Sequence, residues 1–341
     1  MRTTAFLAAV CLLSSALFAA DQPTAQTNTQ PPVHTKKVEK TPNFIPAKAD
    51  PLIGDWQGAG GIVAQVYLSP TGEYQANLLK AFDSENNLVA TLHGIAADGT
   101  VNFTGDGWTA TADPAHFKGS KDADSFDLQH ITRTSPTLGA KPPEGAVVLF
   151  DGTNLDAWSK KAGKDWLTED GPPKWKLVDG GAVEIIPGSD SLITHQKFGD
   201  CHLHVEFRTI GFPSKSAVFM EARYEANINE TYGRTDGNMT GGMDNSTEAA
   251  HPKVRAALPT LAWQTFDIDF RAPRFDASGN KTEKAKETVV LNGVKLYDNQ
   301  ELDPPHGAAG RLGEAPTGPV MLQDHLTPLQ YRNIWILEDK K

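Results

Sequence analysis

The stretch Ala217–Asn229 reads AVFMEARYEANIN and alternates between two kinds of side chain. From residue 218 the even positions are apolar or small: Val218, Met220, Ala222, Tyr224, Ala226 and Ile228. From residue 221 the odd positions are polar: Glu221, Arg223, Glu225, Asn227 and Asn229. A period of two predicts a single half-buried β-strand whose two faces meet different surroundings. Its polar face either stays solvated, as is common in antiparallel sheets, or binds a polar ligand.

The segments around this stretch follow the same pattern. From 201 to 208 the odd positions are apolar or cysteine and the even positions are histidine, glutamate or arginine, and 263–271 alternates likewise. Asn292-Gly293 supplies the positive φ angles of a hairpin turn. No long helical period appears in this half, so we expect two antiparallel sheets packed as a sandwich. On a concave sheet the polar faces would converge and bring together Glu206, Arg208, Glu221, Arg223, Glu225 and Asn227.

The first half of the chain predicts a separate domain. Residues 50–134 contain short alternating segments divided by turns such as Pro70-Thr71-Gly72, which predicts a small all-β domain of unknown role. Trp56 and Trp108 are expected in its core. Residues 135–144 are proline-rich and predict a linker, and 145–341 would form the sandwich.

The N-terminus predicts export. Residues 1–20 combine Arg2, an apolar run and small residues at the end, which indicates a signal peptide and a periplasmic or secreted protein. Residues 21–49 have no apolar period and predict a disordered linker, and we expect no membrane span in the mature chain. Without the signal, Cys201 is the only cysteine, so no internal disulfide can form. The 42 acidic residues outnumber the 32 basic ones, which argues against a nucleic-acid partner.

Several motifs of the second half occur in an order that is typical of one family. They are LFDGTNLDAW at 149–158, EFR at 206–208, RYE at 223–225, the run 263–275, LNG at 291–293, LQDH at 322–325 and YRNI at 331–334. With them the chain, from about residue 145 onward, resembles the domain of unknown function 1080 family, described as 3-keto-glucoside 1,2-lyases, 3-keto-2-hydroxy-glucal hydratases or 3-keto-disaccharide hydrolases. The resemblance implies an all-β, concanavalin-like jelly-roll β-sandwich. Lys215-Ser216-Ala217 stands where the family usually has Asn-Ser-Gly, so substrate choice is expected to differ.

The chemistry that the resemblance implies needs three groups. A ketone at C3 of a sugar makes the C2 hydrogen acidic, so the oxygen at C1 can leave by elimination if a base, an acid and a group that stabilises the O3 anion are present. His325 is the candidate base, with a purely structural histidine as the alternative. Glu225 is the candidate acid, or else a ligand for a divalent metal ion. Arg223 would bind substrate or the enolate, or instead pair with Glu225 or Glu221.

Further residues on polar faces are candidates for substrate binding: Glu206, Arg208, Glu221, Asn227, Gln323 and Arg332. The expected substrate is a 3-keto-glycoside or 3-keto-disaccharide, cleaved by elimination, by hydration of the resulting glucal, or by both. The alternative hypothesis for the function is a carbohydrate-binding module without catalysis, since a jelly-roll fold alone does not determine function. The many ionisable residues favour the enzyme. No cofactor is certain, and metal ligands are unassigned; His202 and His204 have a spacing that suits a metal but are expected to be solvated.

Overall fold

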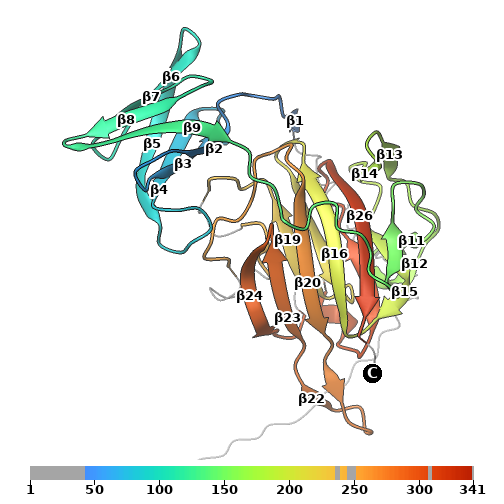
Figure 1. Cartoon of the computed structure of the whole chain (residues 1–341). Coiled ribbons are helices and arrows are strands. Elements are labelled where there is room, and N and C mark those ends of the chain that lie inside the picture. Colours follow the sequence, from blue (N-terminus) through green and yellow to red (C-terminus); the bar gives the residue numbers. More distant parts are fainter. Residues whose placement is uncertain (1–42, 235–238, 244–250, 306–308, 340–341) are drawn as a thin grey trace, which may run out of the picture. The chain divides into compact units, whose positions relative to one another are not determined.

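The computed structural model describes residues 43–234, 239–243, 251–305 and 309–339, and within these ranges the fold is all-β (Figure 1). The only helix in the described ranges is a short 3-10 turn, η2 (Gly310–Leu312). The predicted fold class, a β-sandwich preceded by a small all-β domain, is therefore confirmed. The predicted signal peptide and residues 21–42 of the predicted linker lie outside the described residues. No helix in the described ranges is long and apolar enough to cross a membrane.

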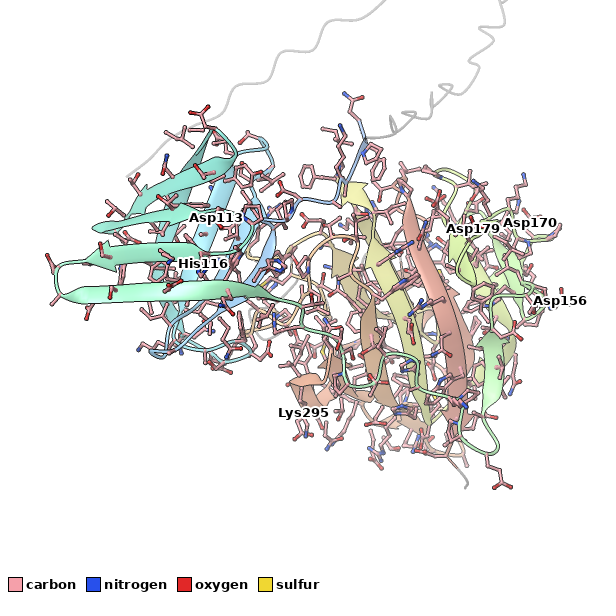
Figure 2. The ribbon with its side chains drawn as sticks, turned by 45° about the horizontal axis from the view of Figure 1, so that its top comes forward. Asp113, His116, Asp156, Asp170, Asp179 and Lys295 are labelled. Atoms are coloured by element: carbon pink, nitrogen blue, oxygen red, sulfur yellow. The ribbon has the colours of Figure 1, made fainter. Side chains whose placement is uncertain are left out.

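The small domain is a closed antiparallel barrel. Its strands are β2 (Gly54–Gln57), β3 (Val63–Leu68), β4 (Tyr74–Leu79), β5 (Leu88–Ala97), β6 (Thr100–Gly105), β7 (Trp108–Ala112), β8 (Phe117–Lys121) and β9 (Asp124–Ile131). Trp56 and Trp108 lie in its apolar core, as predicted. The β7–β8 turn holds Asp113 and His116, whose backbone N–H donates to the Asp113 carboxylate over 2.8 Å (Figure 2). Large aromatic side chains, Trp56 and Trp108 among them, fill the barrel interior.

The sandwich consists of two antiparallel sheets. The eight-stranded sheet runs in the order β13 (Lys176–Val178), β14 (Ala182–Glu184), β26 (Leu329–Glu338), β16 (Cys201–Thr209), β20 (Gln264–Arg271), β23 (Lys286–Leu291) and β24 (Val294–Glu301), with β10 (Val147–Phe150) also on β26. The six-stranded sheet runs in the order β12 (Asp165–Glu169), β11 (Trp158–Ala162), β15 (Leu192–Phe198), β25 (Gly318–Leu322), β18 (Lys215–Met220) and β19 (Tyr224–Asn229). A small two-stranded sheet pairs β21 (Arg274–Phe275) with β22 (Lys281–Glu283).

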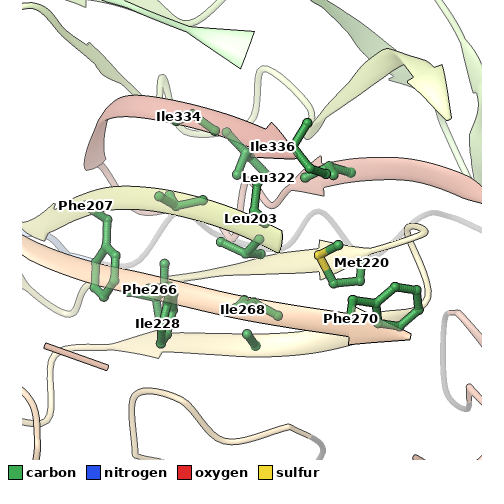
Figure 3. Packing of buried hydrophobic residues seen from close by; sticks show 14 of the residues in the cluster. Leu203, Phe207, Met220, Ile228, Phe266, Ile268, Phe270, Leu322, Ile334 and Ile336 are labelled. Atoms are coloured by element: carbon green, nitrogen blue, oxygen red, sulfur yellow. The ribbon is translucent and has the colours of Figure 1, made fainter. Parts of the chain in front are cut away.

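The main core lies between the two sheets. Figure 3 shows Leu203 and Phe207 of β16 packed with Phe266 of β20, and Met220 and Ile228 of the six-stranded sheet in the same cluster. All five side chains are buried, and each contributes about 1.5–3 kcal/mol by leaving water. The outward residues of the same strands are polar in many places, so this alternation leaves each sheet with a separate outer face.

The stretch 217–229 is a hairpin and not the single strand that we predicted. β18 ends at Met220, β19 begins at Tyr224, and the N–H of Arg223 donates to the C=O of Met220 over 2.9 Å. Glu221 and Ala222 both have φ of 53°, as the two central residues of a type I′ turn do. Met220 and Tyr224 are cross-strand partners and therefore share a face. The alternation runs through the turn unbroken, so the sequence pattern could not reveal it.

A second correction concerns residues 43–49, which lie in the predicted disordered linker. Here β1 (Ile45–Pro46) pairs with β17 (Gly211–Phe212) of the sandwich, and the N–H of Ala47 donates to Ile210 over 2.9 Å. Gly211 allows this contact, because a Cβ there would lie 2.4 Å from the ring of Phe44. A two-residue strand has no period to detect, which is why the composition suggested disorder.

Candidate functional site

The predicted site residues do not converge on one face, because they belong to two different sheets and a turn. Glu206 and Arg208 lie on β16 and Arg332 on β26, all in the eight-stranded sheet. Glu221 and Arg223 form the β18–β19 turn. The remaining predicted residues lie on β19 or follow β25 in the six-stranded sheet: Glu225, Asn227, Gln323 and His325. The prediction that Glu206 and Glu225 lie together is therefore wrong.

Glu206 is buried beneath residues 135–140, here called the strap. The strap crosses the outer face of the eight-stranded sheet, where the N–H of Gly139 donates to Glu206 Oε1 over 2.6 Å. Arg332 donates to Glu206 Oε2 over 2.6 Å, and Asn333 donates to Oε1 over 2.8 Å. Two residues earlier in the strap, the hydroxyl of Thr137 donates to Asp267 over 2.6 Å. Every oxygen of Glu206 is thus used by the protein itself.

These contacts determine the charge state of the cluster. Burial alone would raise the pKa of Glu206, but hydrogen bonds from His204, Asn333, Arg332 and Gly139 outweigh it and lower the pKa to about 2. Burial works against protonation of His204, yet its bonds to Asp267 and Glu206 raise its pKa overall. His204 also stacks on Trp335, with ring centroids 5.0 Å apart. The arrangement is a closed ionic network, which is typical of a structural contact.

Arg208 and Arg332 share one aromatic side chain. Their guanidinium carbons lie 4.6 Å and 4.1 Å from the ring centroid of Trp263. Arg208 donates to Gln330 over 2.7 Å. Burial and the charge of Arg332 lower the pKa of Arg208. His202 and His204, the pair with metal-like spacing, bond to Asp269 and Asp267 of the neighbouring strand over 2.7 Å and 2.6 Å. His204 is fully buried, so the expectation that both histidines are solvated is wrong for it.

The turn residues are buried at the end of the hairpin. Arg223 is 6% exposed; it donates to the C=O of Gly313 and, over 3.0 Å, to the C=O of Glu221. Burial raises the pKa of Glu221 to about 8, and the fully buried Glu287 of β23 is raised to about 8 for the same reason, helped by Glu221. The guanidinium of Arg223 therefore stabilises the turn, and this geometry does not support its predicted contact with substrate.

The outer face of the six-stranded sheet brings the other predicted residues together. Glu225 pairs with Phe219 and Asn227 pairs with Ala217, so these four side chains share one face. The N–H of Gln323 donates to the C=O of Ala217 over 2.9 Å, which places Gln323 beside the same row. Its side-chain oxygen Oε1 is buried and has no hydrogen-bond partner in the described structure. A buried unpaired acceptor costs about 1–3 kcal/mol, so this oxygen is a locally destabilising feature of the face.

His325 follows β25 in an irregular turn. The strand ends at Leu322, so the alternation that we used to orient His325 does not extend to it. Two neighbours fix its place instead: Gln323 bonds to Ala217, and Thr327 accepts from the N–H of Lys215 over 2.8 Å. His325 is exposed and lies between these two anchors, beside the start of β18. The face therefore has a solvent-accessible histidine at its margin.

An apolar patch adjoins this polar group. Ile193, Ala217, Phe219, Ala222 and Met321 form a second cluster, and the half-buried Trp166 of β12 packs edge-on against Phe219 with ring centroids 5.4 Å apart. Sequence reasoning missed Trp166; the half-buried Lys215 of this face belongs to the segment 215–217 that departs from the family pattern. Trp166 lies far from Glu225 in the sequence, and Lys215 lies before the alternating stretch. Only the pairing of the strands shows that both side chains belong to this face.

A separate pocket of about 430 Å³ lies beside β11 of the same sheet. It is bounded by Ser159, Glu169 and His195, and His195 Nδ1 lies 2.7 Å from Glu169 Oε2. Asp156 lines it as well and is labelled in Figure 2. None of the predicted site residues lines this pocket.

A metal site is not evident in the described part of the chain. No group of three or more His, Cys, Asp or Glu side chains there is arranged to hold an ion.

The comparison with protein families identifies the second half. Residues 145–337 match the model of the 3-keto-alpha-glucoside-1,2-lyase-like domain, which is more than half of the chain. The chain belongs to this family. Membership makes it a carbohydrate-active enzyme that acts on glycosides, and the motifs that predicted the family from the sequence are confirmed. No curated protein matches the chain.

Solved structures similar to the chain include two proteins of Parabacteroides distasonis ATCC 8503 that are provisionally described as glycosyl hydrolases. One is 27% identical with a TM-score of 0.49, covering 58% of this chain and 85% of its own; the other is 15% identical with a TM-score of 0.42, covering 58% and 95%. A β-glucanase of Bacillus licheniformis is 12% identical with a TM-score of 0.30, covering 57% and 99%. The family assignment rests on the match over 145–337.

Proposed function

We propose that this member of the family cleaves 3-keto-glycosides at the outer face of the six-stranded sheet. The observation that carries the proposal is the register, which puts Glu225, Asn227 and Gln323 on one face, while His325 follows β25 as an exposed residue. This face combines a carboxylate, an imidazole and amides, and among the described residues the buried Gln323 Oε1 has no hydrogen-bond partner. The face of the eight-stranded sheet offers similar residues, but the strap covers Glu206 there.

In the proposed reaction, His325 removes the proton from C2 of the keto-sugar. The electron pair passes into the C2–C3 bond and gives an enolate on O3, which amide donors such as Asn227 stabilise. The enolate then forms the C1–C2 double bond and expels the oxygen at C1, which takes a proton from Glu225. Addition of water to the resulting glucal completes a net hydrolysis. In a variant of this scheme, Glu225 would instead bind a divalent metal ion, and the ion would polarise O3.

The test compares a 3-keto-glucoside with its unoxidised parent. Purified protein should release the aglycone from the keto-sugar and leave the ordinary glycoside intact, because only the ketone acidifies C2. In deuterated water the recovered sugar should carry deuterium at C2. Parallel reactions with a chelator decide between the acid and the metal-ligand roles of Glu225. Cleavage of both substrates at comparable rates would overturn the elimination mechanism, and saturable binding without any cleavage would support a carbohydrate-binding module.

We further propose that the enzyme is exported to the periplasm or beyond the cell. The support is the sequence of residues 1–20, with its basic start, apolar run and small residues. Detection of the protein in the periplasmic or culture fraction, with a new N-terminus near residue 21, would test this.

A further inference from the structure

A row of outward-facing polar side chains on the barrel is buried. Asp55, Gln65 and Asn77 are cross-strand neighbours on β2, β3 and β4, and they alternate with residues of the barrel core. Outward side chains of a small barrel usually meet water. These three are only 2%, 1% and 3% exposed. A segment from outside the barrel therefore covers them, and the hydrogen bonds identify it as residues 231–234 of the sandwich half.

Tyr232 makes the central contact of this segment. Its hydroxyl donates to Asp55 Oδ1 over 2.9 Å, and its side chain is 3% exposed. Asp55 is held in turn by Arg133, whose Nε donates to Oδ2 over 2.9 Å. Asn77 donates to the C=O of Gly233. Gly233 has φ of 73°, and a Cβ there would lie 2.3 Å from the ring of Tyr67, so the contact requires glycine.

The same segment is joined to the strand that carries Glu225 and Asn227. β19 ends at Asn229, close before Tyr232 in the sequence. Thr231 accepts from the N–H of Thr240 over 3.2 Å. The next residues, Gly241 and Gly242, bond to the C=O and N–H of Asn227 over 2.7 Å and 2.8 Å. A displacement of the segment 231–234 would therefore displace the backbone of Asn227 as well, through Thr240, Gly241 and Gly242.

We propose that the barrel positions the candidate site through the Tyr232–Asp55 contact, with Tyr232 as the positioning residue. The inference rests on the proposed function of the face with Glu225 and Asn227. It gives the barrel a role, because the barrel then anchors the segment that fixes the outer edge of β19. A second contact also holds the sandwich half to the barrel: Arg255, later in the chain, donates to Asn87 of the barrel over 3.1 Å.

The test uses Tyr232→Phe in the full chain. The substitution keeps the ring and removes one buried hydrogen bond, so we expect the amides of Asn227, Gly241 and Gly242 to exchange with deuterium about tenfold faster. With the 3-keto-glucoside, kcat should fall about tenfold while KM and the melting temperature change little. Asn77→Ala removes the hydrogen bond to the C=O of Gly233 and should likewise make the same amides exchange faster.

Tyr74→Phe is the matched control. Tyr74 also donates to a carboxylate, Asp50 Oδ2, over 2.6 Å, but both residues belong to the N-terminal part. This variant should leave amide exchange at Asn227 and kcat unchanged. Unchanged exchange in Tyr232→Phe, or faster exchange with unchanged kcat, would overturn the proposal. If exchange increases but the parent turns over no keto-sugar, the proposed function fails while the anchoring of β19 by the barrel stands.

Discussion

The two outer faces of the sandwich carry similar residues in different surroundings. On the eight-stranded sheet, Glu206 is fully buried and receives hydrogen bonds from the strap, Arg332 and Asn333. On the six-stranded sheet, Glu225 is half-buried and shares a face with Asn227. The comparison teaches that a polar residue on a strand face is a candidate for ligand binding only where it keeps accessible surface, which the half-buried Glu225 does in the described structure and Glu206 does not.

The largest expected effect comes from exchanging the two carboxylates for amides. Glu225→Gln should lower aglycone release about 10³-fold, because the amide keeps the shape but cannot transfer a proton. Glu206→Gln should keep kcat per folded molecule within about threefold, since Glu206 has no exposed surface. Initial rates, normalised to the folded fraction from circular dichroism, measure both. His325→Ala should resemble Glu225→Gln.

The reverse outcome would break the comparison. If Glu206→Gln abolished release in a protein that melts like the parent, the strap would have to leave its face during catalysis. Full activity of both Glu225→Gln and His325→Ala would remove the six-stranded face from the mechanism.

The second effect concerns stability in acid. The pKa of Glu206 is lowered to about 2 in the folded state, against 4.5 for an ordinary glutamate. The unfolded state therefore binds the proton first, so this stability is present above pH 4.5 and is lost as pH falls from 4.5 to about 2. The difference of pKa corresponds to about 3 kcal/mol. His204 has a raised pKa, so its contribution is complete below pH 6.5 and declines only at higher pH, outside this window.

Urea denaturation of the parent and of Glu206→Gln measures this effect. At pH 7 the variant should be less stable by about 3 kcal/mol, and the difference should shrink toward pH 3 as the parent loses its advantage. A difference that is constant between pH 7 and pH 3 would show that Glu206 is not held ionised by its neighbours.

Much of the fold could be predicted because alternation is a local signal. The inward positions Val218, Ala226 and Ile228 are buried as the period of two required. The turn at Glu221 was hidden because a hairpin whose last pair is Met220 and Tyr224 preserves that period. Local patterns thus fix which face a residue takes and not which strand it belongs to.

The site could be predicted only in part, because the decisive contacts are distant in sequence. The strap reaches Glu206 across 67 residues, and Tyr232 reaches Asp55 across 177. No period or motif encodes such pairs, so Glu206 and Glu225 looked equivalent. Glu225 and His325 came from motifs of the family; the register puts Glu225 on the outer face of the six-stranded sheet, and His325 follows β25 in the same sheet.

The smallest expected effect tests whether the strap is only structural. The hydroxyl of Thr137 donates to Asp267 over 2.6 Å and lies 2.9 Å from the hydroxyl of Thr265. Thr137→Val keeps the shape and removes these bonds, so the free energy of unfolding should fall by about 1 kcal/mol. Aglycone release should not change, because the strap lies on the eight-stranded sheet. Thr111→Val is a matched control, since its bond to Asn102 is exposed and should contribute little. A loss of release in Thr137→Val at unchanged stability would mean that the covered face takes part in the reaction, and the contrast between the two faces would no longer hold.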